Sequence, residues 1–174
     1  RPPYSVPFTR RLHPETSYPI QLGLVPVKED LEIDLAGRLG WNIRLPRSAF
    51  PTVLTKEFWA AKRVHGKTIR EMFAPKSEGG YVAATVEQVV SDLDLVHRLI
   101  PNAQIAAHNA GFDYGFLRRL YELAGRRCPY DYHLVDLATL GAISVGETKL
   151  DRIANALGVL PTGHSHDALS DATI

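Results

Sequence analysis

The sequence has a single cysteine, Cys128, and no long apolar run. One cysteine excludes an internal disulfide and favours a reducing compartment. No apolar stretch approaches the ~18 residues that cross a bilayer. The N-terminal RPPYSVPFTRRLHP carries basic residues but lacks the apolar core of a signal peptide. We therefore expect a cytoplasmic protein with no membrane partner.

The chain also lacks a large excess of positive or negative charge. It has 20 Lys and Arg residues and 19 Asp and Glu residues, for a net charge of +1. This balance argues against a generally basic protein that wraps nucleic acid. Local basic patches remain open at Lys62-Arg63 with Lys67 and Arg70, at Arg118-Arg119 and at Arg126-Arg127, with solvated faces of surface helices as the alternative. Across 174 residues, the 45% hydrophobic and 22% charged content suits one globular domain with a substantial core.

No repeat, low-complexity tract or linker divides the chain. Residues 1–17 are rich in proline and arginine and have the weakest pattern, so we expect an irregular N-terminal segment, or an altered first strand, before a domain over residues 18–174. Within that domain, apolar alternation and short apolar runs predict strands over residues 19–27, 41–46, 104–108 and 133–140, with 104–108 buried.

Helices are predicted by capping boxes and by apolar spacing. The boxes are Thr68 to Glu71 and Thr85 to Gln88, and the second precedes an apolar helical face that runs to Ile100. Further helices are expected over residues 55–64, 114–124 and 150–157 and from 168 onward. Strands first, then alternating helices and strands, favour an α/β fold with a mixed β-sheet, antiparallel at one end and parallel at the other, flanked by helices.

The stretch IAAHNAGFDYGFL, residues 105–117, places Asp113 just after a predicted strand. In α/β sheets, ligands gather at the carboxyl ends of the strands. Asp113 can equally cap the helix that follows, a role in which aspartate is common. Taken alone, the stretch favours the cap.

The C-terminal HSHDALSDATI places His166 in the loop before the last helix and Asp171 inside that helix. Asp113 and Asp171 can share divalent cations, because hard cations prefer carboxylate oxygens. His166 can then deprotonate a water that attacks phosphorus. A zinc site at His164, His166 and Asp167 lacks a cysteine or third histidine at a usual spacing. A serine hydrolase would need a G-x-S-x-G elbow, which the chain lacks.

Two segments, AHNAGFDYGFL and HDALSDA, resemble the second and third motifs of the DEDDh family of 3′–5′ exonucleases. That family includes the proofreading subunit of bacterial replicative polymerases. PIQLGLV resembles its second strand, VHGKT its H-G-I-T segment, LVDLATL the strand that carries an aspartate and a threonine, and LDRIANALGV the helix before the third motif. These segments fall in the family's order over about residues 18–174.

The resemblance implies a ribonuclease-H-like fold, two Mg²⁺ or Mn²⁺ ions and release of nucleoside monophosphates from single-stranded DNA or RNA 3′ ends. It implies that Asp113 and Asp171 are metal ligands and that His166 is the general base. A polymerase or another replication or repair protein is an expected partner. Asn109 is expected either to orient the strand end or to satisfy a buried backbone group, and Phe112 either to pack against a base or to join the core.

The family's first motif, D-x-E-T-T-G-L, is not found. Alignment of its leucine with Leu12 puts Val6 and Phe8 where the two acids should stand. Three explanations remain open: a degenerate exonuclease, an altered or incomplete N-terminal segment, and substitution by other acids. The candidate substitute ligands are Glu15, Asp30 and Glu32.

Two other classes of function remain open. A catalytically degenerate binding module would hold a nucleic-acid end or a polymerase without cleaving it, and a purely structural domain would bind no nucleic acid. The choice between DNA and RNA also stays open, because it depends on contacts to the sugar 2′ position.

Overall fold

The computed structural model describes residues 17–55, 59, 62, 66–159 and 168–172. Its main sheet has the order β1-β2-β3, formed by Gln21–Leu24, Leu39–Ile43 and Val82–Ala84. β1 and β2 are antiparallel, whereas β2 and β3 are parallel. The predicted mixed sheet is therefore confirmed, and so are strands at the first two predicted positions.

A second, smaller sheet pairs β4, Ala106–Ala107, in parallel with β5, Val135–Asp136. The strand predicted over 104–108 is shorter than expected and is not buried, since Ala106 is exposed. The strand predicted over 133–140 is mostly wrong, because the chain becomes helical at Leu137. The Asp136 carboxylate accepts a hydrogen bond from the Ala138 amide at 3.3 Å and thereby caps the new helix.

The described elements outside the sheets are the following: η1 (Arg47–Leu54), α2 (Ile69–Phe73), α3 (Val86–Leu99), α4 (Ala110–Leu123), α5 (Leu137–Ser144), α6 (Leu150–Ala156) and α7 (Ala168–Ala172). Both predicted capping boxes are confirmed, at the starts of α2 and α3. The helix predicted over 55–64 falls largely outside the described residues. In the described part of the chain, no helix is long and apolar enough to cross a membrane.

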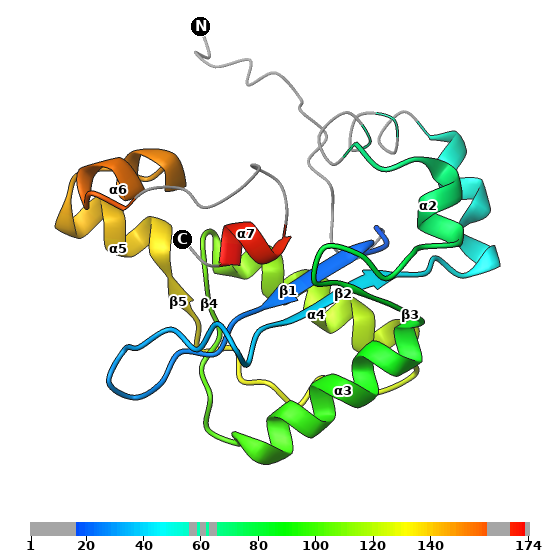
Figure 1. Cartoon of the computed structure of the whole chain (residues 1–174), viewed down its shortest axis with the longest axis horizontal. Helices are drawn as coiled ribbons and strands as arrows, with labels where there is room; N and C mark the ends of the chain where they lie inside the picture. The colour runs from blue at the N-terminus through cyan, green and yellow to red at the C-terminus, as the bar shows by residue number, and fades with distance from the viewer. Residues whose placement is uncertain (1–16, 56–58, 60–61, 63–65, 160–167, 173–174) are drawn as a thin grey trace, which may run out of the picture.

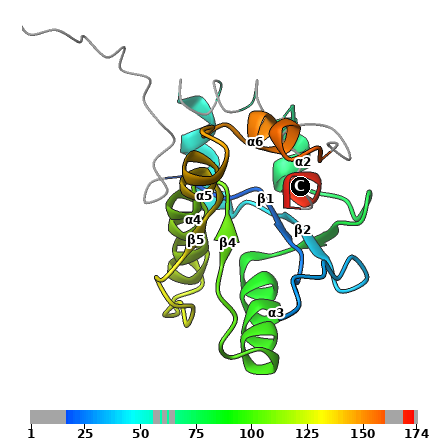
Figure 2. The same cartoon turned by 90° about the vertical axis from the view of Figure 1, so that its left-hand side faces the viewer.

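Helices cover both faces of the main sheet. Figures 1 and 2 show α7 on one side of β1 and β2 and α3 on the other, with α4 beside α3. The main core lies between β2, α3 and α4, and its fully buried side chains include Ile43, Val89, Leu120 and Tyr121. The helix predicted behind the Thr85 capping box is found as α3, and its apolar face is fully buried as far as Leu93. Leu99 and Ile100, at the end of that face, are exposed.

Two tyrosine hydroxyls of this core donate hydrogen bonds to α3. Tyr130 donates to the Leu93 carbonyl at 2.7 Å, and Tyr121 donates to Asp94 Oδ1 at 2.9 Å. Burial, and then the Asp94 carboxylate, raise the pKa of Tyr121 well above its usual range, so its hydroxyl stays protonated and donates. Arg126 pairs with the same carboxylate. The bond from Tyr121 on α4 to Asp94 on α3 holds these two helices together, and α4 carries Asp113.

Candidate active site

The predicted site residues fall in three places. Asp113, Asn109 and Phe112 lie at the start of α4, Asp30 and Glu32 lie in the loop between β1 and β2, and the backbone of Asp171 lies in α7. The side chain of Asp171 is outside the description. His166 and Glu15 lie outside the described residues, and so do His164 and Asp167.

Asp113 sits in the first turn of α4 and does not cap it. The helix begins at Ala110, earlier than the predicted Tyr114, and its N-cap residue is Asn109. The interpretation of Asp113 as the cap is therefore wrong. In the described part of the chain, its carboxylate accepts no hydrogen bond from another residue's side chain.

The pKa of Asp113 is raised, chiefly by burial, although its own backbone amide and the nearby His108 act in the opposite direction. The side chain is nevertheless exposed at the surface, so the loss of solvent is partial. A bound cation would offset this desolvation, because it favours the charged carboxylate. Asp113 thus fits the hard oxygen donor that Mg²⁺ or Mn²⁺ prefers.

His108 is a neighbour that sequence reasoning did not assign. Its side chain is half-buried, and its Nδ1 atom is buried with no hydrogen-bond partner among the described residues. Its attraction lowers the pKa of Asp113. The available signal was its position at the end of the predicted strand, directly before Asn109.

Asn109 and Phe112 face solvent on the same turn. Asn109 has φ 63° and ψ 50°, the left-handed conformation that asparagine tolerates well, and its side chain makes no cap hydrogen bond. Phe112 is 39% exposed and meets Phe116 edge-on, with ring centroids 4.9 Å apart. An exposed ring next to Asp113 can stack on a nucleobase.

The helix that carries Asp171 is docked closely on the main sheet. Leu169 of α7 is buried, and its amide donates to the Tyr81 hydroxyl at 2.7 Å. Gly23 of β1 permits this approach, since a Cβ atom there would lie 2.5 Å from the Ala168 carbonyl oxygen. The position of α7 therefore depends on the absence of a side chain at residue 23.

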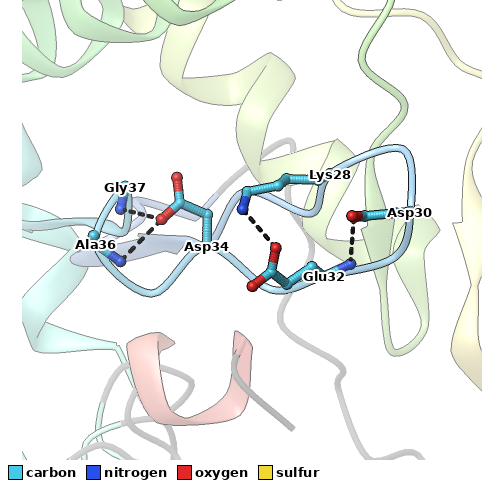
Figure 3. Close-up of polar contacts among 6 residues, drawn as sticks. All are labelled: Lys28, Asp30, Glu32, Asp34, Ala36 and Gly37. Carbon is cyan, nitrogen blue, oxygen red and sulfur yellow. Dashed lines mark hydrogen bonds and ion pairs between the residues drawn. The ribbon is translucent and has the colours of Figure 1, made fainter.

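Asp30 and Glu32 are engaged within their own loop (Figure 3). Asp30 Oδ1 accepts from the Glu32 amide at 3.0 Å, and Glu32 Oε2 pairs with Lys28 Nζ at 2.6 Å. Both acids are exposed and hold the turn together. Among the residues that the structure describes, no three His, Cys, Asp or Glu side chains gather into a metal site. A ligand role for Asp30 or Glu32 stays a prediction and would require the loop to give up these bonds.

Comparison with known proteins supports the motifs in the second half of the chain. The exonuclease (RNase T) family model matches residues 82–174, which is more than half of the chain. A DNA polymerase III subunit epsilon-like protein of Rhodobacter capsulatus is 35% identical over 79 residues, 43% of this chain and 11% of that protein. A ribonuclease T of Buchnera aphidicola is 33% identical over 93 residues, 49% of this chain and 43% of that protein.

The matched stretches thus span less than half the length of each of these relatives. The family match begins at β3 and includes α4 with Asp113 and α7 with Asp171. The mixed sheet flanked by helices agrees with the ribonuclease-H-like architecture of exonuclease domains. On this evidence the chain belongs to the exonuclease family.

Proposed function

We propose that this domain is a divalent-metal-dependent 3′–5′ exonuclease that releases nucleoside monophosphates from single-stranded DNA or RNA. The observation that carries the proposal is Asp113 in the first turn of α4, the helix that follows β4. Its carboxylate is partly desolvated, has no side-chain partner among the described residues, and lies in the segment that matches the exonuclease family. Such a group is suited to a cation that contacts a phosphate.

In this proposal, Asp113 and Asp171 hold the metal ions and His166 accepts a proton from the attacking water. Bound Mg²⁺ or Mn²⁺ would neutralise charge on the scissile phosphate and make the water more acidic. Phe112 would stack on the terminal base, because its ring is exposed next to Asp113. The exposed Asn109 would contact the sugar or phosphate at the 3′ end.

The missing first motif defines the second candidate function, a degenerate module that binds nucleic acid or a polymerase without cleaving it. Val6 and Phe8 favour this candidate, because neither side chain can bind a cation. Glu15, Asp30 and Glu32 are the acids proposed as substitutes in an active enzyme. The name of the Rhodobacter relative motivates a polymerase or another replication or repair protein as partner. We place this activity in the cytoplasm, in keeping with the single cysteine.

The test is Mn²⁺-dependent shortening of a 5′-labelled single-stranded oligonucleotide, with DNA and RNA in parallel. Attack from the 3′ end gives a ladder that loses one nucleotide at a time. We expect Asp113→Asn and His166→Ala to abolish the ladder. Asp151→Asn is the matched control, because Asp151 is an exposed acid in the first turn of α6, as Asp113 is in α4. Binding by fluorescence anisotropy without any shortening would instead establish the module.

Substitutions of the candidate substitute acids separate the remaining explanations. If the parent chain cleaves, Glu15→Gln, Asp30→Asn and Glu32→Gln identify which carboxylate completes the site. Loss of turnover without loss of stability marks a ligand. Asp30→Asn and Glu32→Gln also weaken the loop, so the free energy of unfolding is measured beside the turnover rate.

A further inference from the structure

The carboxylate of Asp136 joins the starts of two helices. Its Oδ1 atom accepts from the Asn109 amide at 2.8 Å and from the Ala110 amide at 3.3 Å, both at the start of α4. The same atom accepts from the Ala138 amide at 3.3 Å, and Oδ2 accepts from the Thr139 hydroxyl at 2.8 Å, both in α5. Asp136 therefore caps its own helix α5 and, from across the small sheet, caps α4 as well.

The start of α4 depends on this contact from outside. The first amides of a helix have no partner within the helix and need one from elsewhere. A capping side chain normally supplies it, but the Asn109 side chain makes no cap hydrogen bond. Asp136 fills that role by accepting from the backbone of Asn109 and Ala110.

The sheet alone gives this region little rigidity. β4 and β5 pair through only two residue pairs, Ala106 with Val135 and Ala107 with Asp136. Immediately after β4, the chain makes its left-handed turn at Asn109. The bonds from Asp136 thus fix the backbone between the end of β4 and the first turn of α4, and Asp113 lies in that turn.

The pKa of Asp136 is lowered, first by the hydrogen bond from Thr139 and then, against a smaller opposing effect of burial, by those from the Ala110, Asn109 and Ala138 amides. The group is therefore ionised at neutral pH, and charged acceptors form the stronger hydrogen bonds.

We infer that Asp136 is a positioning residue for the metal site: it holds the Asn109–Ala110 backbone and thereby sets where Asp113 presents its carboxylate. This inference rests on the proposed function of Asp113. Asp136 itself would not bind the metal, because its oxygens accept bonds from the two helix starts. Outer contacts that orient a ligand typically change metal affinity by ~10–100-fold when they are lost.

Three variants of the full chain distinguish two roles of Asp136: capping of α5, which is purely structural, and positioning of the start of α4. Asp136→Ser keeps a good N-cap for α5, but serine is too short to reach Asn109 and Ala110. Thr139→Val removes the Oδ2 bond and leaves the bonds to α4 in place. Asp136→Asn retains an acceptor oxygen for both helix starts and serves as the conservative rescue.

The readouts are Mn²⁺ affinity by titration calorimetry, kcat and KM on the oligonucleotide, urea unfolding, and hydrogen exchange of the Asn109 and Ala110 amides. For Asp136→Ser we expect ~10–100-fold weaker Mn²⁺ binding and a similar loss in kcat. The KM should stay within about 2-fold, because Asp136 does not touch the nucleic acid. Exchange at the two amides should accelerate. Asp136→Asn and Thr139→Val should bind Mn²⁺ nearly as the parent does.

Unchanged Mn²⁺ affinity in folded Asp136→Ser overturns the inference, and so does an equal loss in Thr139→Val. A parent chain that neither binds Mn²⁺ nor cleaves overturns the proposed function instead. The link between the two helix starts is then decided by exchange alone. Faster exchange at Asn109 and Ala110 in Asp136→Ser but not in Thr139→Val supports the link, and unchanged exchange overturns it.

Discussion

Gly23→Ala is expected to displace the helix that carries Asp171. A methyl group at residue 23 would lie 2.5 Å from the Ala168 oxygen, 2.6 Å from its carbonyl carbon and 2.7 Å from the Leu169 nitrogen. All three neighbours are backbone atoms, so no side chain can rotate away. Ordinary contact begins at 3.4 Å, and α7 must therefore retreat from β1 by roughly 0.9 Å.

The expected loss of stability lies between the cost of overpacking and the cost of releasing α7 completely. Overpacking of this kind typically costs ~1–3 kcal/mol, whereas replacing glycine in a strand returns about 0.5–1 kcal/mol of backbone entropy. Complete release of α7 would expose Leu169, at ~1.5–3 kcal/mol, and would break the hydrogen bond from its amide to Tyr81. We therefore expect a net loss of ~1–2 kcal/mol with α7 shifted but still docked.

Urea unfolding measures the stability, and Mn²⁺-dependent shortening of the oligonucleotide measures the proposed activity. A misplacement of about 1 Å at a site of chemistry can cost ~100-fold, so kcat/KM should fall by ~10–100-fold. Gly111→Ala in α4 is the control for the glycine effect, because its Cβ would meet nothing within 4 Å. It should stabilise the protein by ~0.5–1 kcal/mol. A Gly23→Ala protein at least as stable as the parent, with unchanged kcat/KM, would refute this reasoning.

Burial raises the pKa of Asp113 above its value in the unfolded chain. At pH values above the raised pKa, the charged carboxylate therefore destabilises the folded state; below the unfolded pKa the carboxyl is protonated in both states and has no such effect. Asp113→Asn should therefore raise the Tm in EDTA near pH 7 but not near pH 3, and Mn²⁺ should raise the Tm of the parent alone. Thr85→Ala should lower the free energy of unfolding by ~1 kcal/mol through loss of the α3 cap, whereas Ser91→Ala, exposed within α3, should not. Leu31 is 82% exposed with φ 67°, so Leu31→Gly should stabilise the protein by ~0.5–1 kcal/mol. Leu35, whose φ is not positive, is the control, and Leu35→Gly should destabilise the protein. Equal changes in the free energy of unfolding in urea for the two variants would contradict backbone strain at Leu31.

The helices α3, α4 and α6 were predictable because their signals are local. The Thr85 capping box forms both of its bonds, and the apolar face that follows it is buried as far as Leu93. What the spacing could not show is where the partner surfaces end, and so Leu99 and Ile100 continue the pattern into solvent. Periodicity reports which side chains share a face and not how much of that face is covered.

The second strand of the small sheet was predicted too long because strand-like composition masked a helix start. Residues 133–140 have the apolar, β-branched composition of a strand, but Asp136 caps a helix within them. The sequence held a weak signal of this, since a hydroxyl three residues after an aspartate can bond back to it, as Thr139 does. The hydrogen bonds of the cap outweigh the strand propensity of these residues, which depends strongly on context.

The candidate site was predictable to the extent that its motifs are contiguous. Asp113 was found from one short stretch, yet the residues that hold its turn in place come from β5, and the residue that lets α7 approach comes from β1. With strands of two residues in the small sheet, the position of Asp113 is set by a helix start and not by a long ladder. The proposed site should therefore be sensitive to single changes such as Gly23→Ala and Asp136→Ser, which remove no metal ligand. Neither Gly23 nor Asp136 is a proposed metal ligand, and yet each helps to set where a proposed ligand lies.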